Sequence, residues 1–585
     1  MKQRLFNTLL FIITCMSGLQ VQAADTTLYV SPGEGGILQT ALRQAREYRR
    51  RHDGGTAEIR LSAGIYRLYE ALRFHPEDSH LQLTGEEGTV IAGSIQIKGW
   101  RKEGKLWVAD VPDFNGRPID FRQLWVNGKK AIRARSVADF EKMPRILNYD
   151  KKKQILWVPS RAMKVLKGEV GYTELVLHQM WEIGILRVKS IQTFGDSTAI
   201  TFHQPEARIQ FEHPWPSPMY HSKHDSPFYL VNSLALLDEP GEWYHDIRNH
   251  RLYYMPLRGE NMMLADVEVP VLETLVELTG MSHRKPSDIT FNHITFSYTS
   301  WMRPSYQGHV PLQAGMYLTE AYKLRPQIDR KNNHKLDNQG WLGRPEAAIK
   351  VYYADSIHFK QCTFSHLGGM GLDYLEGCKG GVTSYSTFTD IALNGYVSGS
   401  FSPAGLETHL PYRPDLKDVC EYQEISRSLF TDVANEEWGC LAIAAGYVKN
   451  INIEHNEIHD VPYSAISLGW GWNRDSVCMR NNRVHANLIY RYAQHMYDCA
   501  GIYTLGNQPG TMITENVVRD IAKPSYVHDP NHWFYLYTDE GSSNITLQDN
   551  WTPSDKYLKN AVGPNNQWLN NGPQVSEQIK NRAGR

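Results

Sequence analysis

The sequence predicts an all-β protein: a parallel β-helix with an inserted β-sandwich-like domain and an N-terminal capping helix. Three observations predict this class. A six-residue motif recurs between residues 362 and 521, residues 96–265 interrupt the repeat, and an amphipathic stretch precedes the first strands. With 41% hydrophobic and 11% aromatic residues, the chain of 585 residues can bury the core that such a fold needs.

The first 23 residues are typical of a cleavable signal peptide. Lys2 and Arg4 precede an apolar run over residues 9–16, and Val21 and Ala23 stand at the −3 and −1 positions of a cleavage site. We therefore expect export, either to the periplasm or out of the cell.

Cys15 offers an alternative, as the attachment site of an outer-surface lipoprotein. Thr14 before it fits a lipidation motif poorly, so cleavage after Ala23 is favoured. No later stretch reaches the roughly 18 apolar residues of a membrane helix. We expect a monomer without a membrane span.

The charge balance and the cysteine content limit which binding partners the protein can have. Lys and Arg number 62 against 63 Asp and Glu, and there is no long basic run, which excludes nucleic acid. The six cysteines after residue 23 lack zinc-type spacing, so we expect buried thiols, no metal and no cofactor, although an exported chain permits disulfides. The 15 Trp and 32 Tyr suit stacking on sugar rings.

Residues 24–95 are expected to hold the cap and the first coils. Apolar residues at helical spacing predict a helix over residues 38–48, and the strand-like residues 59–61 follow. The residues with this spacing are Leu38, Ala41, Leu42, Ala45 and Tyr48. We expect the helix to cover the open end of the repeat.

Residues 96–265 are expected to form the separate β-sandwich-like domain. Asn127-Gly128 between two apolar runs predicts a two-residue hairpin. Alternating runs at residues 175–177 and 252–255 also favour antiparallel strands.

Residues 266–560 are expected to form the main β-helix, followed by a poorly packed tail over residues 561–585. The motif reads small polar, any residue, large apolar, any residue, usually Asp, usually apolar, and it starts again after 24 to 42 residues. The shortest spacing suits one three-strand coil, with loops of variable length. The residues predicted to stack inside are Phe364, Phe388, Phe430, Ile458, Val484 and Val518.

The repeat separates structural carboxylates from chemical ones. Four aspartates share one motif position and are interpreted as turn residues: Asp390, Asp432, Asp460 and Asp520. Asp539 differs, because an offset of 34 residues places it over Leu505. Two-residue alternation turns Asp539 outward, onto a face with Tyr503, Tyr535 and Tyr537.

Asp498 is the best second carboxylate. It is also unrepeated and lies just before its strand on the neighbouring coil, so the two aspartates could supply the acid and the nucleophile or base of a glycosidase. Fully extended strands would separate them by roughly 20 Å, so the pairing requires residues 498–501 to bend back over the sheet. The alternative is that Asp498 only binds backbone amides in a turn.

Nearby aromatic and acidic residues are candidates for substrate binding. Trp470 and Trp472 share one side of an extended segment and could stack on a pyranose ring, the alternative being a loop folded against the helix. Glu437 lies at the leading edge of the sheet, and Glu540 shares the turn of Asp539. The full candidate set is Glu437, Trp438, Trp470, Trp472, Tyr503, Tyr535, Tyr537 and Glu540.

The chain resembles glycoside hydrolase family 141. The resemblance rests on residues 498–511, 537–544, 469–473 and 124–135, and it covers nearly the whole mature chain. It implies a right-handed β-helix with an inserted β-domain, and the hydrolysis of plant cell-wall glycans.

The resemblance also implies a catalytic pair and two activities. Matched motif by motif, the pair is Asp498 and Asp539. Family members include α-L-fucosidases and xylanases. The favoured expectation is an α-L-fucosidase that releases fucose from complex pectin (rhamnogalacturonan) side chains, and the alternative is a xylanase or β-xylosidase.

Two other classes of protein are alternatives to a glycoside hydrolase. A polysaccharide lyase on the same scaffold needs cations to neutralise a uronate and a base such as Lys or Arg, whereas the strand faces around Asp539 carry tyrosines and acids. A non-catalytic glycan-binding β-helix would keep its aromatic residues and survive the loss of both carboxylates.

Overall fold

The computed structural model describes residues 25–52, 55–213, 215–222, 224–320, 341–401, 414 and 416–585. The predicted signal peptide and Cys15 lie outside these residues. Among the described residues, no helix is long and apolar enough to cross a membrane.

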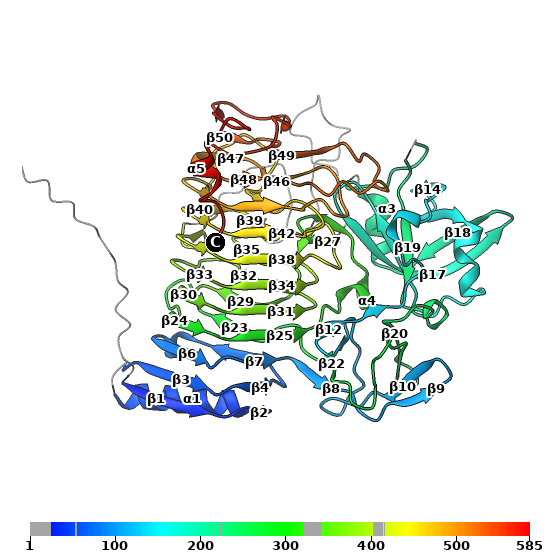
Figure 1. Ribbon diagram of the computed structural model, residues 1–585, viewed down its shortest axis with the longest axis horizontal. Coiled ribbons are helices and arrows are strands. Elements are labelled where there is room, and N and C mark those ends of the chain that lie inside the picture. The colour runs from blue at the N-terminus through cyan, green and yellow to red at the C-terminus, as the bar shows by residue number, and fades with distance from the viewer. Residues whose placement is uncertain are drawn as a thin grey trace, which may run out of the picture.

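Three long sheets of parallel strands form a layered column (Figure 1). The first has twelve strands, from β1 (Thr26–Val30) to β52 (Gln567–Leu569). The second has ten strands, from β2 (Gly33–Glu34) to β48 (Val517–Val518), and the third has ten, ending at β51 (Tyr557–Lys559). This architecture is consistent with the parallel β-helix that the repeat predicts.

The predicted apolar stack is confirmed for most of its length. Phe364 and Phe388 stack at a ring-centroid distance of 4.4 Å, and Phe388 stacks on Phe430 at 4.4 Å. These residues are fully buried, and Phe430 pairs in register with Ile458.

One coil was assigned to the wrong register. Ile458 pairs with Ile489, which in turn pairs with Val518, while Val484 belongs to another sheet and pairs with Ile453. The prediction failed because two similar segments follow each other within eight residues, and only pairing with neighbouring coils distinguishes them.

Buried asparagines connect successive coils at one corner. Asn487 Oδ1 accepts the backbone N–H of Asn456 at 3.0 Å, and Asn516 Oδ1 accepts that of Asn487 at 2.9 Å. Asn550 continues the ladder at 3.1 Å. Each side chain thus satisfies a backbone donor that would otherwise be buried without a partner.

The four repeated aspartates share one backbone conformation, although Asp390 and Asp432 lie within strands rather than in turns. All have a left-handed backbone, with φ between 49° and 55°. Aspartate tolerates this conformation better than most residues because its short side chain can hydrogen-bond locally.

Helix α1 (Ile37–Arg51) lies at the start of the column (Figure 1). It packs against β1 and against β3 (Ala57–Leu61). As the helical spacing predicts, its buried residues are Leu38, Ala41, Leu42 and Ala45.

The chain leaves the column after β7 (Thr89–Ala92) and rejoins it at β23 (Val276–Thr279). We call residues 96–265 the inserted segment. Its strands are mainly antiparallel, in sheets of four, five and six strands, and it lies beside the column (Figure 1). The predicted hairpin is present, because β11 (Trp125–Val126) pairs with β12 (Lys129–Lys130) across Asn127-Gly128.

The C-terminal tail is better packed than expected. β52 extends the first sheet, and Asn550 donates to Asn571 Oδ1 at 2.7 Å, which prolongs the asparagine ladder. The N–H of Gly584 donates to Ala486 O at 2.8 Å. The polar composition of the tail therefore reflects ladder residues rather than poor packing.

The six cysteines after residue 23 are free and buried, as expected for small thiols in a strand core.

Candidate active site

A pocket of about 390 Å³ lies between the last coils of the column and the inserted segment. Both predicted catalytic residues, Asp498 and Asp539, line it. The other lining residues are Trp181, Trp215, Leu312, Gln313, Tyr463, Trp472, Tyr503, Tyr537, Glu540 and Asn560.

Asp498 lies on the side of the column that faces this pocket. It directly precedes β46 (Cys499–Thr504) and has a left-handed backbone with φ of 55°. Its Oδ1 lies 3.0 Å from His532 Nε2. The hydrogen bond to Asp498 raises the pKa of His532, so a protonated imidazole can stabilise the ionised carboxylate.

Asp539 directly follows β49 (Trp533–Thr538). It accepts hydrogen bonds from Tyr503 Oη at 2.6 Å and from Asn560 Nδ2 at 2.7 Å. These two bonds favour the ionised form, but burial and the nearby charge of Asp498 outweigh them and raise the pKa of Asp539. Asp539 therefore keeps its proton to a higher pH than an exposed aspartate.

Two tyrosines connect the carboxylates. Tyr537 Oη lies 3.4 Å from Asp498 Oδ1, and the rings of Tyr537 and Tyr503 meet edge to face at 5.0 Å. Residues 499–501 belong to an extended strand, so the predicted bend over the sheet is absent. The tyrosine side chains bridge the gap between the two strand ends instead.

The two carboxyl groups have environments suited to different tasks. One is paired with a histidine, while burial raises the pKa of the other. Such a division between two carboxyl groups is what acid and nucleophile or base catalysis at a glycosidic bond requires. The separation of the carboxyl carbons, which we expect to be within about 10 Å, stays a prediction.

The structure brings four of the eight predicted binding residues into this pocket: Trp472, Tyr503, Tyr537 and Glu540. The other four lie elsewhere. Glu437 is fully buried, and its charge acts on the neighbouring Glu182, while Trp438 is 2% exposed and stacks on His495 at 4.3 Å. Neither lines the pocket, because both side chains are buried against neighbouring segments.

Trp470 and Tyr535 are also core residues rather than pocket residues. Trp470 packs edge to face against Phe401 at 4.9 Å, so only Trp472 of the two tryptophans reaches the pocket. Tyr535 packs in the main core and against Trp533 at 5.6 Å. Strict alternation fails at Tyr535, which faces the core like its neighbour Leu536.

Several pocket residues were missed by sequence reasoning. Trp181 and Trp215 come from the inserted segment, while Leu312 and Gln313 come from β26 (Pro311–Gln313). No local pattern marks them, because they reach the pocket only through folding.

Repeat offsets point to two more residues of the site. His532 lies 34 residues after Asp498, the offset of the last coils, and Asn560 lies 21 residues after Asp539, the offset of the final coil. Among the described residues, no group of three or more His, Cys, Asp or Glu is placed to hold a metal ion.

A column of parallel strands with two aspartates in one tyrosine-lined pocket is consistent with a carbohydrate-cleaving enzyme, a glycoside hydrolase. The model of the GH141 insertion domain matches residues 104–257. A solved structure named as a glycoside hydrolase is 56% identical, with a TM-score of 0.92, over 96% of this chain and 98% of its own. The chain therefore belongs to glycoside hydrolase family 141.

Other solved structures are much more distant. A structure of XylC in complex with xylose is 12% identical with a TM-score of 0.42, over 86% of this chain and 64% of its own. PfbA, a surface adhesin of Streptococcus pneumoniae, is 11% identical with a TM-score of 0.37, over 92% of this chain and 79% of its own. The comparison with curated proteins found no match.

Proposed function

We propose that this glycoside hydrolase is an exported α-L-fucosidase that releases fucose from complex pectin side chains, using Asp498 and Asp539. The observation that carries the two-aspartate mechanism is that both carboxyl groups line one pocket in contrasting environments. The family resemblance of the motifs around both aspartates supports the sugar and the polymer.

The proposed roles follow from the environments. Asp539, with its raised pKa, donates a proton to the leaving glycosidic oxygen while the bond to the anomeric carbon breaks. Asp498, paired with His532, either attacks the anomeric carbon or removes a proton from the attacking water. The anomeric configuration is retained in the first case and inverted in the second.

Trp472 and Tyr537 supply the flat surfaces on which a sugar ring can rest. Trp181 and Trp215 face them from the inserted segment. The inserted segment would then contribute residues to the substrate-binding site.

A polysaccharide lyase is less well supported. Among the described residues that line the pocket, none is Lys or Arg. Lyase chemistry on a uronate needs a positive charge to stabilise the carboxylate as the neighbouring proton leaves.

Structural expectations complete the proposal. We expect a right-handed coil, a cap formed by α1, an inserted segment that is a domain of its own, and a monomer in the periplasm or outside the cell.

The test is product analysis with purified protein. Fucosylated pectin fragments and xylan fragments are incubated in parallel, and the released sugars are identified by chromatography. Free fucose is expected. Xylose or xylo-oligosaccharides would instead support the alternative, a xylanase or β-xylosidase. Unsaturated uronates would indicate a lyase, and binding without any product would indicate a non-catalytic protein.

The stereochemical outcome is measured in the same system. Proton NMR at early times identifies the anomer released first. Retention assigns Asp498 as the nucleophile, and inversion assigns it as the base.

A further inference from the structure

A second pocket, of about 270 Å³, lies where the inserted segment meets the column. It shares no lining residue with the catalytic pocket. The hairpin of β16 (Glu174–His178) and β17 (Ile183–Phe194) separates the two pockets. Val176 and Ile185 of this hairpin line the second pocket, while Trp181 at its turn lines the catalytic one.

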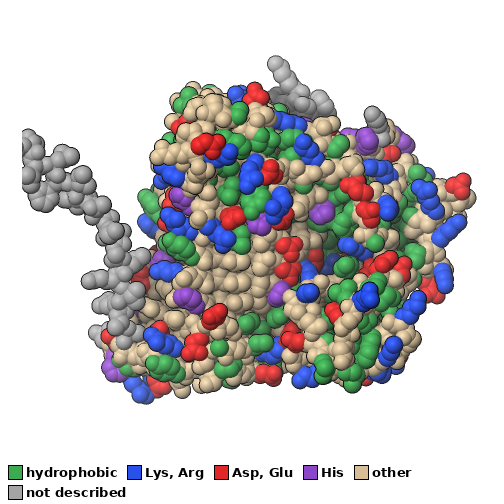
Figure 2. All heavy atoms as spheres, in the orientation of Figure 1, with side chains coloured by type: hydrophobic (Ala, Val, Ile, Leu, Met, Phe, Trp, Pro, Cys, Tyr) green, Lys and Arg blue, Asp and Glu red, His purple; other side chains and the backbone are tan. Residues whose placement is uncertain are grey.

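Positive charge dominates the wall of the second pocket. Four of its lining residues are cations and one is an acid. The cations are Arg122, Lys130, Arg133 and Arg135, and the acid is Glu436. Figure 2 shows basic and acidic side chains gathered where the column and the inserted segment meet.

The nearby carboxylates compensate these cations incompletely. Arg122 and Arg133 share the carboxylate of Glu174, while Lys130 pairs with Glu436 at 2.6 Å and with Asp390 at 3.5 Å. Arg135 forms no ion pair within the described part of the chain. Its guanidinium lies over the ring of Phe140 at 4.6 Å.

Hydrogen-bond donors in the pocket also lack acceptors. The Nε atoms of Arg122, Arg133 and Arg135 are buried and have no hydrogen-bond partner among the described residues. Arg122 as a whole is only 6% exposed, so water reaches it poorly. Buried donors of this kind are costly unless a ligand supplies oxygen atoms.

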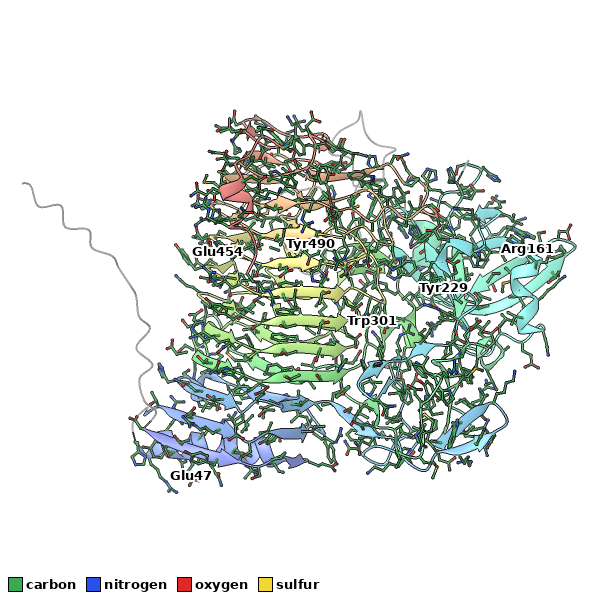
Figure 3. The ribbon with its side chains drawn as sticks, in the orientation of Figure 1. Glu47, Arg161, Tyr229, Trp301, Glu454 and Tyr490 are labelled. Atoms are coloured by element: carbon green, nitrogen blue, oxygen red, sulfur yellow. The ribbon has the colours of Figure 1, made fainter. Side chains whose placement is uncertain are left out.

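Four aromatic rings form another part of the wall. Phe140 and Tyr229 come from the inserted segment, and Trp438 and His495 come from the column. Burial lowers the pKa of His495 to about 3, so its ring is neutral. These rings offer an apolar surface beside the guanidinium groups, and Figure 3 shows Tyr229 on the inserted segment.

We propose that this pocket binds a carboxylate-bearing sugar ring, a uronate, away from the bond that is cleaved. A planar guanidinium can bind a carboxylate with two parallel hydrogen bonds, and one uncompensated arginine matches one negative charge. Pockets for larger ligands span roughly 300 to 1,000 Å³, so 270 Å³ suits a single ring. The inference does not depend on which sugar the enzyme releases.

Isothermal titration calorimetry with free monosaccharides tests the inference without turnover. Galacturonate is expected to bind the wild-type protein, whereas neutral galactose is expected to bind at least about tenfold more weakly. Arg135→Met should weaken galacturonate binding by about tenfold or more, because it removes the guanidinium but no ion pair. Arg161→Met is the matched control, since Arg161 is exposed at the outer edge of the inserted segment (Figure 3).

Two further variants are measured in the same binding experiment. Arg135→Lys keeps the positive charge but loses the planar guanidinium that can form two parallel hydrogen bonds. Its affinity for galacturonate is expected to lie between that of the wild type and that of Arg135→Met. Trp472→Ala, in the catalytic pocket, should leave galacturonate binding unchanged. Thermal melting checks that each variant is folded, and Arg135→Lys serves as the test variant if Arg135→Met is not.

Four outcomes would overturn the inference. They are no galacturonate binding by the wild-type protein, equal binding by wild type and both Arg135 variants, loss of binding in Trp472→Ala, and inorganic sulfate binding as tightly as galacturonate. The last would identify a general anion site rather than a uronate site. None of these results bears on Asp498 and Asp539, whose test is the release of sugar.

Discussion

At the scale of single residues, burial and hydrogen bonding give two aspartates different chemistry. Asp539 is half-buried between Tyr503 and Asn560, and its pKa is raised, while Asp498 faces the imidazole of His532. An aspartate in water has a pKa of about 3.9 and would be fully ionised at neutral pH. The local environment of each group therefore assigns the roles.

Asp539→Asn is expected to fold normally and to lose most activity. Asparagine can keep both hydrogen-bonding neighbours but cannot donate a proton to the leaving oxygen, a role that contributes about 10²- to 10⁴-fold to the rate. Initial rates and a thermal melt of the purified variant check this. Turnover close to that of the wild type in a folded variant would remove Asp539 from the mechanism.

Tyr503→Phe should move the alkaline limb of the pH profile. The hydroxyl of Tyr503 stabilises the ionised form of Asp539, so its loss raises the pKa of Asp539 further. Since the acid must be protonated, kcat falls as the pH rises through that pKa, and the fall should occur at a higher pH in the variant.

Tyr535→Phe is the control for that experiment, because Tyr535 packs in the core and does not line the pocket. A profile that shifts in Tyr535→Phe as much as in Tyr503→Phe would contradict the role given to the Tyr503 hydroxyl.

At the scale of elements, the turns between strands contribute stability rather than chemistry. Asp460 has a φ of 55° and accepts from Arg491 Nε at 2.7 Å. The hydrogen bond with Arg491 is the main reason that the pKa of Asp460 is lowered to about 2. The same motif position in other coils has the same left-handed backbone, so the repeat itself marks it as structural.

Asp460→Asn is expected to lower the melting temperature slightly and to keep full turnover. Asparagine accepts the left-handed backbone, so the loss is that of a partly exposed ion pair, roughly 1 kcal/mol or less. The contribution of Asp460 is present above the unfolded pKa of about 3.9 and is lost as the pH falls toward about 2.

The difference in melting temperature between wild type and Asp460→Asn should therefore shrink as the pH is lowered from about 5 to about 3. A selective loss of turnover with an unchanged melting temperature would show that the repeat does not separate structural from catalytic carboxylates.

At the scale of the whole molecule, a pair of buried carboxyl groups joins the column to the inserted segment. Glu182 and Glu437 are both fully buried, and the charge of Glu437 acts on Glu182. Glu182 also accepts from the N–H of Gly315 at 3.2 Å. The pair lies close to the catalytic pocket, because Glu182 directly follows Trp181 in the chain. Trp181 lines that pocket and donates to Leu312 O at 2.7 Å.

This pair should make stability fall as the pH rises from about 4.3 to about 7. Burial raises the pKa of Glu437 to about 7, and burial and the charge of Glu437 raise the pKa of Glu182 well above its usual range. A raised pKa means that the stabilised form is the protonated one. Its contribution is present below the unfolded pKa of about 4.3 and is lost as the pH rises through about 7.

Glu437→Gln should therefore reduce the fall in melting temperature between about pH 5 and pH 7. Glutamine keeps a hydrogen-bond donor for Glu182 and cannot ionise. Glu47→Gln is the control, since Glu47 is exposed on α1 at the far end of the column (Figure 3). An equal pH dependence in wild type and Glu437→Gln would contradict the role given to Glu437.

The sequence by itself determined the features that recur from one coil to the next or that depend on a short stretch of chain. The offset of 34 residues placed Tyr537 beside Tyr503 and Asp498 beside His532, and the structure pairs them that way. The repeated aspartates, the hairpin at Asn127 and the helix at the N-terminus also follow from local patterns. Such features are repeated or local, so a short stretch of sequence contains their cause.

Only the tertiary structure decided which residues enclose the pocket. Trp181 and Leu312 are more than a hundred residues apart in the chain, yet they form one wall because the inserted segment folds back onto the column. The register of the coil at Asn487 and the inward turn of Glu437 were likewise settled by packing against neighbours. Contacts between distant segments depend on how whole sheets pack, and no local pattern encodes them.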